Sequence, residues 1–231
     1  VKAVELRDQV CRVEEEMLVR PELIAKAVYK FFQVASDGDD VLVINPDDGT
    51  IVERFKFGRQ HGGEGLGLAD YVVPVQDGRP DYMAAFVTSI GPGVRELAHE
   101  WLESGEYLAS HILQALSLEG AESLAEILHK KIRAMWGFPD PKDIKKQDLF
   151  SPKYPGRRYS FGYPACPRLE DQEQLWRMLL PDDRIGVRLT DGYMMDPEGS
   201  VSALVFHDPK AKYFNLSEED VARLEERIRS K

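Results

Sequence analysis

Cysteine and long apolar runs are scarce in this sequence, and each shortage excludes a class of protein. The 231 residues include two cysteines, Cys11 and Cys166, too few for a disulfide framework or a zinc site built mainly of thiolates. No apolar run approaches the roughly 20 residues that a membrane helix needs, and the chain begins without an apolar signal region. We therefore expect a protein with no membrane role in a reducing, cytoplasmic setting.

Positive charge is also scarce. Lysine and arginine total 30 against 40 aspartates and glutamates, so the formal net charge is −10. Because nucleic-acid binding needs clustered cations, this balance disfavours such a role. The five histidines form no close pair with metal-ligand spacing, so no metal site is predicted. His129 follows a helical apolar stripe and is expected to be a helix-surface or a satisfied buried histidine.

Strands come first along the chain, then helices, then strands again. Helical spacing predicts an amphipathic helix over residues 3–19, and a short helix is expected from Pro21 to Lys26. Strand-forming residues separated by turns predict an antiparallel meander over 28–57. Its strands are expected at 28–34, 41–44 and 51–57. A further strand is expected at 82–90.

Helical spacing returns in the region 93–136, where Gly105 and Gly120 are the expected breaks. The polar, proline-bearing stretch 137–155 predicts a long connection. The C-terminal β/α part, 169–229, follows. Its expected elements are a helix at 169–180, strands at 185–189 and 201–206 around the turn DPEG, and a helix at 221–228 opened by a capping box of Ser217 and Asp220. This order predicts an α+β fold, as a single domain over residues 1–231.

The glycine-rich stretch 58–67 contains HGGEGLG, which invites a phosphate-loop interpretation. Such a loop needs a buried strand before it and a helix directly after it. Here ERFKFGRQ precedes and LADYVVP follows, and neither flank fits. A flexible loop is therefore predicted, and a conventional Rossmann-type methyltransferase site is disfavoured.

The segment 154–167, YPGRRYSFGYPACP, combines aromatic residues, prolines and glycines with two arginines. Proline and glycine fix the backbone, so the segment can present aromatic faces and a guanidinium on one rigid surface. An arginine fork suits an amino-acid carboxylate, and aromatic faces suit a sulfonium. A tightly packed irregular loop explains the same residues equally well, so chemistry alone leaves both interpretations open. Within it, Cys166 is expected to be a buried, inert thiol.

RxxxGYPACP in this segment resembles the signature of the activation domain of cobalamin-dependent methionine synthase. Weaker similarities to the same family support it in order along the chain: LADYV (68–72), DYMAAFV (81–87), HKKIRAMWGF (129–138), MDPEGSVS (195–202) and HDPKAKYF (207–214). The family has LADFV where this chain has LADYV. The resemblance implies a bent antiparallel sheet with a central group of helices.

In that family the domain binds S-adenosylmethionine, and the resemblance assigns roles by position. It implies that Arg158 is the carboxylate partner and that Tyr163 faces the corrin ring. The implied cofactor-binding residues are Arg158, Tyr159, Ser160, Phe161, Gly162, Tyr163, Ala165, Tyr213 and Phe214. Phe214 stands where some members have a second tyrosine. The family's upstream D-W-x-P-F-F-type segment, whose aspartate contacts the cofactor, is not in this sequence, which leaves open whether an upstream aspartate completes the site.

The resemblance implies a repair function rather than acid–base catalysis, so no catalytic side chain is expected. S-adenosylmethionine and one electron from a flavodoxin-like donor would convert cob(II)alamin, carried by a partner domain in the same or a separate chain, to methylcobalamin. This supports methyl transfer from methyltetrahydrofolate to homocysteine in methionine biosynthesis. A stand-alone S-adenosylmethionine-binding protein, serving another corrinoid enzyme or acting as a sensor, is the alternative hypothesis.

Overall fold

Helices and antiparallel strands are mixed along the chain, which confirms the α+β class. The computed structural model describes residues 2–144 and 153–230, so residues 145–152 of the expected long connection lie outside the described part. None of the helices in the described part is long and apolar enough to cross a membrane.

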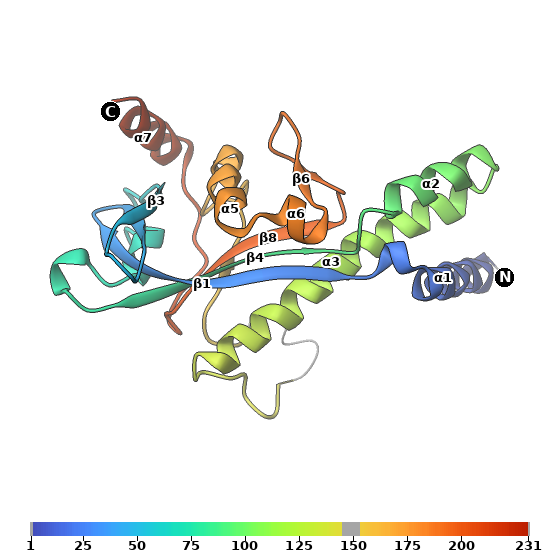
Figure 1. Ribbon diagram of the computed structural model, residues 1–231, viewed down its shortest axis with the longest axis horizontal. Helices are drawn as coiled ribbons and strands as arrows, with labels where there is room; N and C mark the ends of the chain where they lie inside the picture. Colours follow the sequence, from blue (N-terminus) through green and yellow to red (C-terminus); the bar gives the residue numbers. More distant parts are fainter. Residues whose placement is uncertain (1, 145–152, 231) are drawn as a thin grey trace. The chain divides into compact units, whose positions relative to one another are not determined.

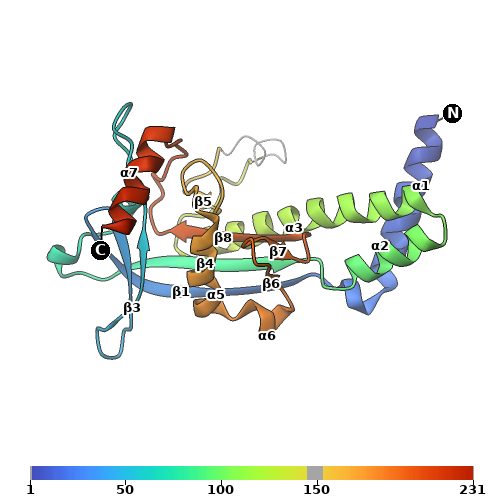
Figure 2. The ribbon, with the colours of Figure 1, turned by 90° about the horizontal axis from the view of Figure 1, so that it is seen from above.

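Six strands form the main sheet, in the order β3-β2-β1-β4-β8-β5. Their bounds are β1 Lys26–Asp37, β2 Asp40–Ile44, β3 Ile51–Lys56, β4 Asp81–Ser89, β5 Arg158–Tyr159 and β8 Ser200–Phe206. The first three strands pair antiparallel in sequence order, which confirms the meander. Figures 1 and 2 show β1, β4 and β8 side by side. Strand β5 was not predicted, and it forms an edge of this sheet.

The helices match the helical periods of the sequence over most of their length. They are α1 Lys2–Val19, α2 Val94–Glu103, α3 Tyr107–Met135, α5 Gln172–Leu179, α6 Pro181–Ile185 and α7 Glu218–Arg229. Single 3₁₀ turns are η1 Pro21–Leu23, η2 Leu68–Tyr71, η3 Val75–Asp77 and η4 Leu169–Asp171. The short helix expected up to Lys26 is thus only the turn η1, because β1 begins at that residue.

Two compact units divide the described chain. The first comprises Val1–Val28, Val87–Ile127 and Leu179–Ser202, and the second comprises Tyr29–Phe86, Leu128–Met178 and Ala203–Lys231. Each unit is therefore assembled from three separate stretches of sequence. The extent of one domain over residues 1–231 stays a prediction.

In the first unit α2 packs along α3, and Ser110 Oγ donates a hydrogen bond to the Ala98 carbonyl at 2.8 Å. The expected break at Gly105 is confirmed by its left-handed φ of +84°. The expected break at Gly120 is wrong, because α3 continues through it. A Cβ there would lie 2.9 Å from Ile90 Cδ1, so this glycine permits close packing against the helix rather than ending it.

The strand expected at 185–189 is also mostly wrong. Pro181 opens the short helix α6, and Gly186, with a φ of +75°, closes it after Ile185. Proline at the first helical position and glycine just past the end are typical helix boundaries. Only β6, Arg188–Leu189, is a strand, and it pairs with β7, Met195–Asp196, in a separate two-stranded sheet.

Aromatic residues form much of the core of the second unit. The buried members include Phe55, Phe57, Tyr71, Tyr159, Phe161 and Phe206. Helix α7 lies beside β3 in both ribbon views (Figures 1 and 2), and Arg227 on α7 donates to Asp40 at 2.7 Å and to the Phe57 carbonyl. The predicted capping box of Ser217 and Asp220 is present. It starts α7 at Glu218, three residues earlier than expected.

Candidate functional site

Strand β5 carries the start of the RxxxGYPACP segment at the edge of the main sheet. Arg158 pairs with Val205 of β8 and Tyr159 with Leu204. Strand β5 stands last in the strand order, so β8 is its only strand neighbour in the described sheet. The Arg158 side chain is half-buried, whereas the Tyr159 side chain is 1% exposed. Pairing with β8 thus turns these neighbouring side chains to different surroundings.

Tyrosine hydroxyls join β5 to the segment that follows β8. Tyr159 Oη donates to the Lys212 carbonyl at 2.6 Å, and Tyr213 Oη donates to the Arg158 carbonyl at 2.8 Å. The rings of Tyr159 and Tyr213 lie 5.4 Å apart. Burial, and then the neighbouring Tyr71, raise the pKa of Tyr159 above its usual range, so its hydroxyl stays a proton donor. Two sequence-distant parts of the predicted site are therefore in direct contact.

Beyond β5 the segment folds into tight turns. Gly162 has a φ of +83°, and its N–H donates to the Cys166 carbonyl at 2.9 Å, while the Cys166 N–H donates to the Tyr163 carbonyl at 2.8 Å. The Phe161 ring is buried and stacks on Phe55 at 6.0 Å. The sequence predicted this irregular conformation from its glycines and prolines.

The predicted site residues divide by exposure. The side chains of Tyr159, Phe161 and Ala165 are buried, so only their backbone atoms remain for a ligand. Tyr163 and Tyr213 expose 57% and 53% of their surface, whereas Arg158 and Ser160 are half-buried and Gly162 is exposed.

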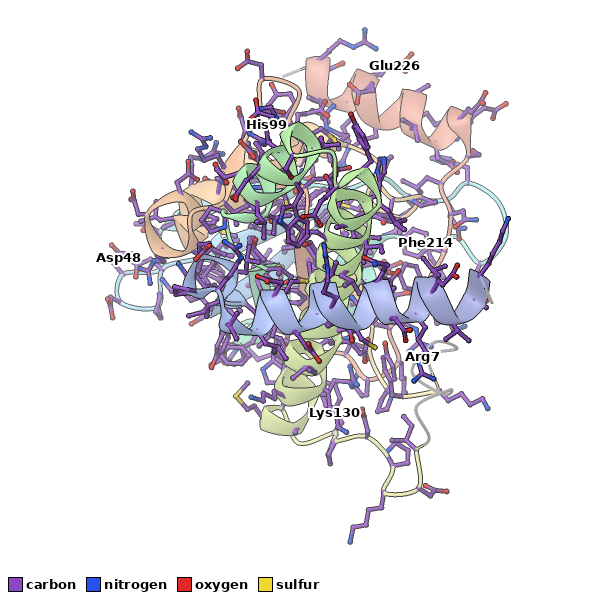
Figure 3. The ribbon with its side chains drawn as sticks, turned by 90° about the vertical axis from the view of Figure 1, so that its right-hand side faces the viewer. Arg7, Asp48, His99, Lys130, Phe214 and Glu226 are labelled. Atoms are coloured by element: carbon purple, nitrogen blue, oxygen red, sulfur yellow. The ribbon has the colours of Figure 1, made fainter. Side chains whose placement is uncertain are left out.

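Phe214 lies on the segment between β8 and α7 (Figure 3) and is buried, so of the adjacent aromatic pair only Tyr213 is exposed.

A buried ion pair supports the chain just before β5. The side chains of Arg133 on α3 and Asp140 are 0% and 2% exposed, and they pair at 2.7 Å. The Arg133 guanidinium also lies 3.7 Å from the centroid of the Tyr154 ring. Arg157 donates to the carbonyls of Tyr154 and Gly156 at 2.7 and 2.6 Å. The end of α3 thereby fixes the backbone that leads to Arg158.

His129 lies one turn before Arg133 on α3 and is fully buried, while the next residue, Lys130, labelled in Figure 3, is exposed. Neither ring nitrogen of His129 has a hydrogen-bond partner among the described residues. The expectation of a surface or satisfied histidine is therefore wrong, because the ring packs edge-on against Tyr154 instead. Burial, then the positive charges of Arg133, Arg158 and Arg157, lower its pKa to about 2. The imidazole is therefore expected to be neutral at pH 7.

Cys166 is 3% exposed, and burial raises the pKa of its thiol. The burial confirms that this cysteine is buried, and the raised pKa favours the predicted inert thiol, which stays a prediction. Nearby, burial raises the pKa of Asp171 to about 6, although the paired Arg168 opposes this shift. Among the described residues no group of three or more histidines, cysteines or carboxylates could hold a metal ion.

The glycine-rich stretch 58–67 is a loop that leads into the single 3₁₀ turn η2 rather than into an α-helix. Its connection to η2 is set by Arg59, which pairs with Asp70 through two nitrogens at 2.8 and 2.6 Å and with Asp39 at 2.6 Å. Arg59 also donates to the Gly65 carbonyl at 2.7 Å. Several backbone N–H groups of the loop also donate within the protein, namely those of His61, Gly65, Leu66 and Gly67.

Comparison with known proteins shows the family of this chain. The family model described as "Vitamin B12 dependent methionine synthase, activation domain" matches residues 2–229. The chain belongs to this family. The family resemblance inferred from RxxxGYPACP is therefore confirmed.

Relatives of this activation domain include two mycobacterial methionine synthases. That of Mycobacterium tuberculosis (strain ATCC 25618 / H37Rv) is 33% identical over 204 residues, covering 83% of this chain and 17% of the relative. That of Mycobacterium leprae (strain TN) is 31% identical over 206 residues, with the same coverages of 83% and 17%. The chain therefore spans about a sixth of the length of these relatives.

A solved structure, described as the crystal structure of the MetH reactivation domain bound to AdoHcy, has the same fold. It is 26% identical, covers 98% of this chain and 73% of its own, and superposes with a TM-score of 0.89. Its helices and antiparallel sheet match those of this activation domain.

Sequence reasoning missed residues that hold the site without belonging to its motif. His129 and Arg133 are four residues apart on α3, so helical spacing places them on one face of the helix. The neighbouring sequence did not show that this face is buried. Tyr71 occurs in the quoted stretch LADYV, yet its contact with Lys212 depends on residues 141 positions apart.

Proposed function

We propose that this chain binds S-adenosylmethionine and serves as the reactivation module of a cobalamin-dependent methionine synthase. The observation that carries the proposal is the contact between Tyr213 and the backbone of Arg158, which unites two separate family motifs at one edge strand. Support also comes from the related reactivation domain, whose structure is described as bound to AdoHcy. AdoHcy is S-adenosylmethionine without its transferable methyl group, so it shares the parts that a protein recognises.

The residues around β5 fit an amino-acid carboxylate and an adenosine group. Arg158 offers a planar guanidinium, which binds a carboxylate with two hydrogen bonds. The positive charge of Arg158, which contributes to the lowered pKa of His129 after burial and Arg133, favours an anion beside it. Exposed Tyr213 offers an aromatic face. The remaining proposed contacts are Tyr159, Ser160, Phe161, Gly162, Ala165 and Phe214.

The methyl donor and the cobalamin supply the chemistry, which is the reductive methylation of cob(II)alamin to methylcobalamin. The share of this chain is to bind and orient the donor rather than to transfer protons. Tyr163 is exposed, so it can face a corrin ring presented by another domain. Its neighbouring turns hold its backbone rigid, which limits the entropy lost on docking.

Further parts of the proposal concern the whole synthase. The proposal includes a cobalamin-binding domain, in the same polypeptide or a separate one, a flavodoxin-like electron donor and a cytoplasmic setting. Both mycobacterial relatives are methionine synthases about six times as long as the matched region. This favours a reactivation module over a stand-alone binding protein.

Calorimetric titration of the chain with S-adenosylmethionine tests the proposal. The wild type is expected to bind, and Arg158→Ala is expected to weaken affinity about 10- to 100-fold, since charge-assisted hydrogen bonds contribute about 1.5–3 kcal/mol. Arg79→Ala is the matched control, because the Arg79 side chain is 69% exposed. Absence of binding by the wild type would refute the function, and equal affinity in Arg158→Ala would remove Arg158 from the site.

A further inference from the structure

Tyr71 contacts both segments that form the proposed site, although it belongs to neither. Its hydroxyl donates to the Lys212 carbonyl at 3.2 Å and accepts from the Lys212 N–H at 3.2 Å. Its ring stacks on that of Tyr159, with centroids 6.1 Å apart and planes inclined by 16°. Tyr71 is 7% exposed, so it lies beneath the surface on which a ligand would bind.

The backbone of Lys212 is the point where these contacts meet. Its carbonyl accepts from both Tyr71 and Tyr159, and its N–H is bonded to Tyr71. The next residue, Tyr213, places its hydroxyl on the Arg158 carbonyl. The conformation of Lys212 therefore determines whether Tyr213 reaches β5.

The glycine-rich loop holds the same segment from another direction. Gln60 donates to the Asn215 carbonyl at 2.9 Å, and Glu64 pairs with the Lys212 ammonium at 2.7 Å. The latter pair is exposed on both sides, so it contributes little stability. Arg59 fixes the loop to Asp70, the residue before Tyr71, and so connects the loop to the buried tyrosine.

We propose that Tyr71 is a positioning residue of the S-adenosylmethionine site, and this inference rests on the proposed function. Its hydroxyl holds Lys212 so that Tyr213 stays against the Arg158 backbone. It acts through Lys212 and touches no ligand. The Tyr71 ring already packs on Tyr159, so the hydroxyl strengthens an arrangement that the ring supports.

Tyr71→Phe tests the inference, because it removes the hydroxyl and keeps the ring. We expect the dissociation constant for S-adenosylmethionine, measured by calorimetry, to rise about three- to ten-fold, as expected for one lost hydrogen bond. The melting temperature should fall by only a few degrees, since the Lys212 carbonyl keeps its bond from Tyr159. The matched control is Tyr82→Phe, where an exposed tyrosine loses the same group.

A double-mutant cycle with Tyr213→Phe separates positioning from general destabilisation. If Tyr71 acts through Tyr213, adding Tyr71→Phe to Tyr213→Phe should change affinity less than two-fold. Full additivity of the two effects on affinity, or wild-type affinity in Tyr71→Phe, would overturn the inference. The proposed function would still stand in either case, provided that the wild type binds S-adenosylmethionine. Absence of binding by the wild type would instead remove the proposed function, and this inference with it.

Discussion

At the residue scale, Gly162 has a backbone conformation and a neighbour that both disfavour a side chain. Its φ is +83°, and a Cβ would lie 3.2 Å from Leu169 Cδ1. We expect Gly162→Ala to lower the free energy of unfolding by about 1–2 kcal/mol, because alanine is strained at positive φ. Urea unfolding measures this as a lower midpoint with an unchanged slope. Gly62→Ala is the control, since nothing lies within 4 Å of its added Cβ; an equal effect there would contradict the prediction.

The two buried residues Cys166 and His129 show how far single positions could be predicted. The sequence around Cys166 showed no cationic or helix-start environment and so predicted a buried, inert thiol, and the structure confirmed the burial. His129 was expected to be exposed or hydrogen-bonded, and it is neither among the described residues. The ring of His129 is covered by Tyr154, which lies 25 residues further along the chain, so the sequence next to His129 did not show its surroundings.

At the scale of elements, the end of α3 depends on the ion pair between Arg133 and Asp140. Removing one member of a buried pair leaves an uncompensated charge and typically costs 3–5 kcal/mol. We expect Asp140→Asn to lose about 3 kcal/mol of unfolding free energy, measured by urea unfolding at pH 7. Asp143→Asn, in an exposed position three residues later, should change stability by less than about 0.5 kcal/mol. A similar loss in both variants would mean that the buried pair has no special role.

Glycine and proline predicted the end of an element correctly only where their own backbone conformation ends it. Gly105 ends a helix at positive φ, whereas Gly120 continues one because its missing side chain accommodates Ile90. The signal for α6 was present in Pro181 and Gly186, but strand-forming residues between 185 and 189 outweighed it. Strand β5 has two residues, too few for any alternation to be detected.

At the scale of the whole molecule, His129 makes stability depend on pH. Its folded pKa of about 2 lies below the ordinary value of about 6.5. The unfolded chain therefore binds the proton first, and stability present above pH 6.5 is lost as the pH falls. Between pH 7.5 and 5 the loss amounts to about 2 kcal/mol.

Urea unfolding of wild type and His129→Leu at both pH values measures this contribution. The wild type should lose about 2 kcal/mol relative to the variant. The comparison with the variant is needed because Asp171, with a folded pKa of about 6, acts in the opposite direction. Its contribution is greatest below its ordinary pKa of about 4 and is lost as the pH rises through 6. An equal change in the free energy of unfolding between the two pH values in both proteins would contradict the prediction. It would show that His129 is protonated, or otherwise partnered, in the folded state.

The sequence by itself determined the family, the α+β class and the segment that forms the proposed site. The class follows from helical spacing and strand-forming runs, whereas the family and the segment follow from the resemblance carried by RxxxGYPACP. Only the tertiary structure decided which side chains of that segment face outward, with Tyr159 and Phe161 buried and Tyr163 exposed. It also decided that Tyr71 and Tyr213 meet β5. The pairing of β5 with β8 and the shared backbone of Lys212 are contacts between distant residues, and no local period encodes them.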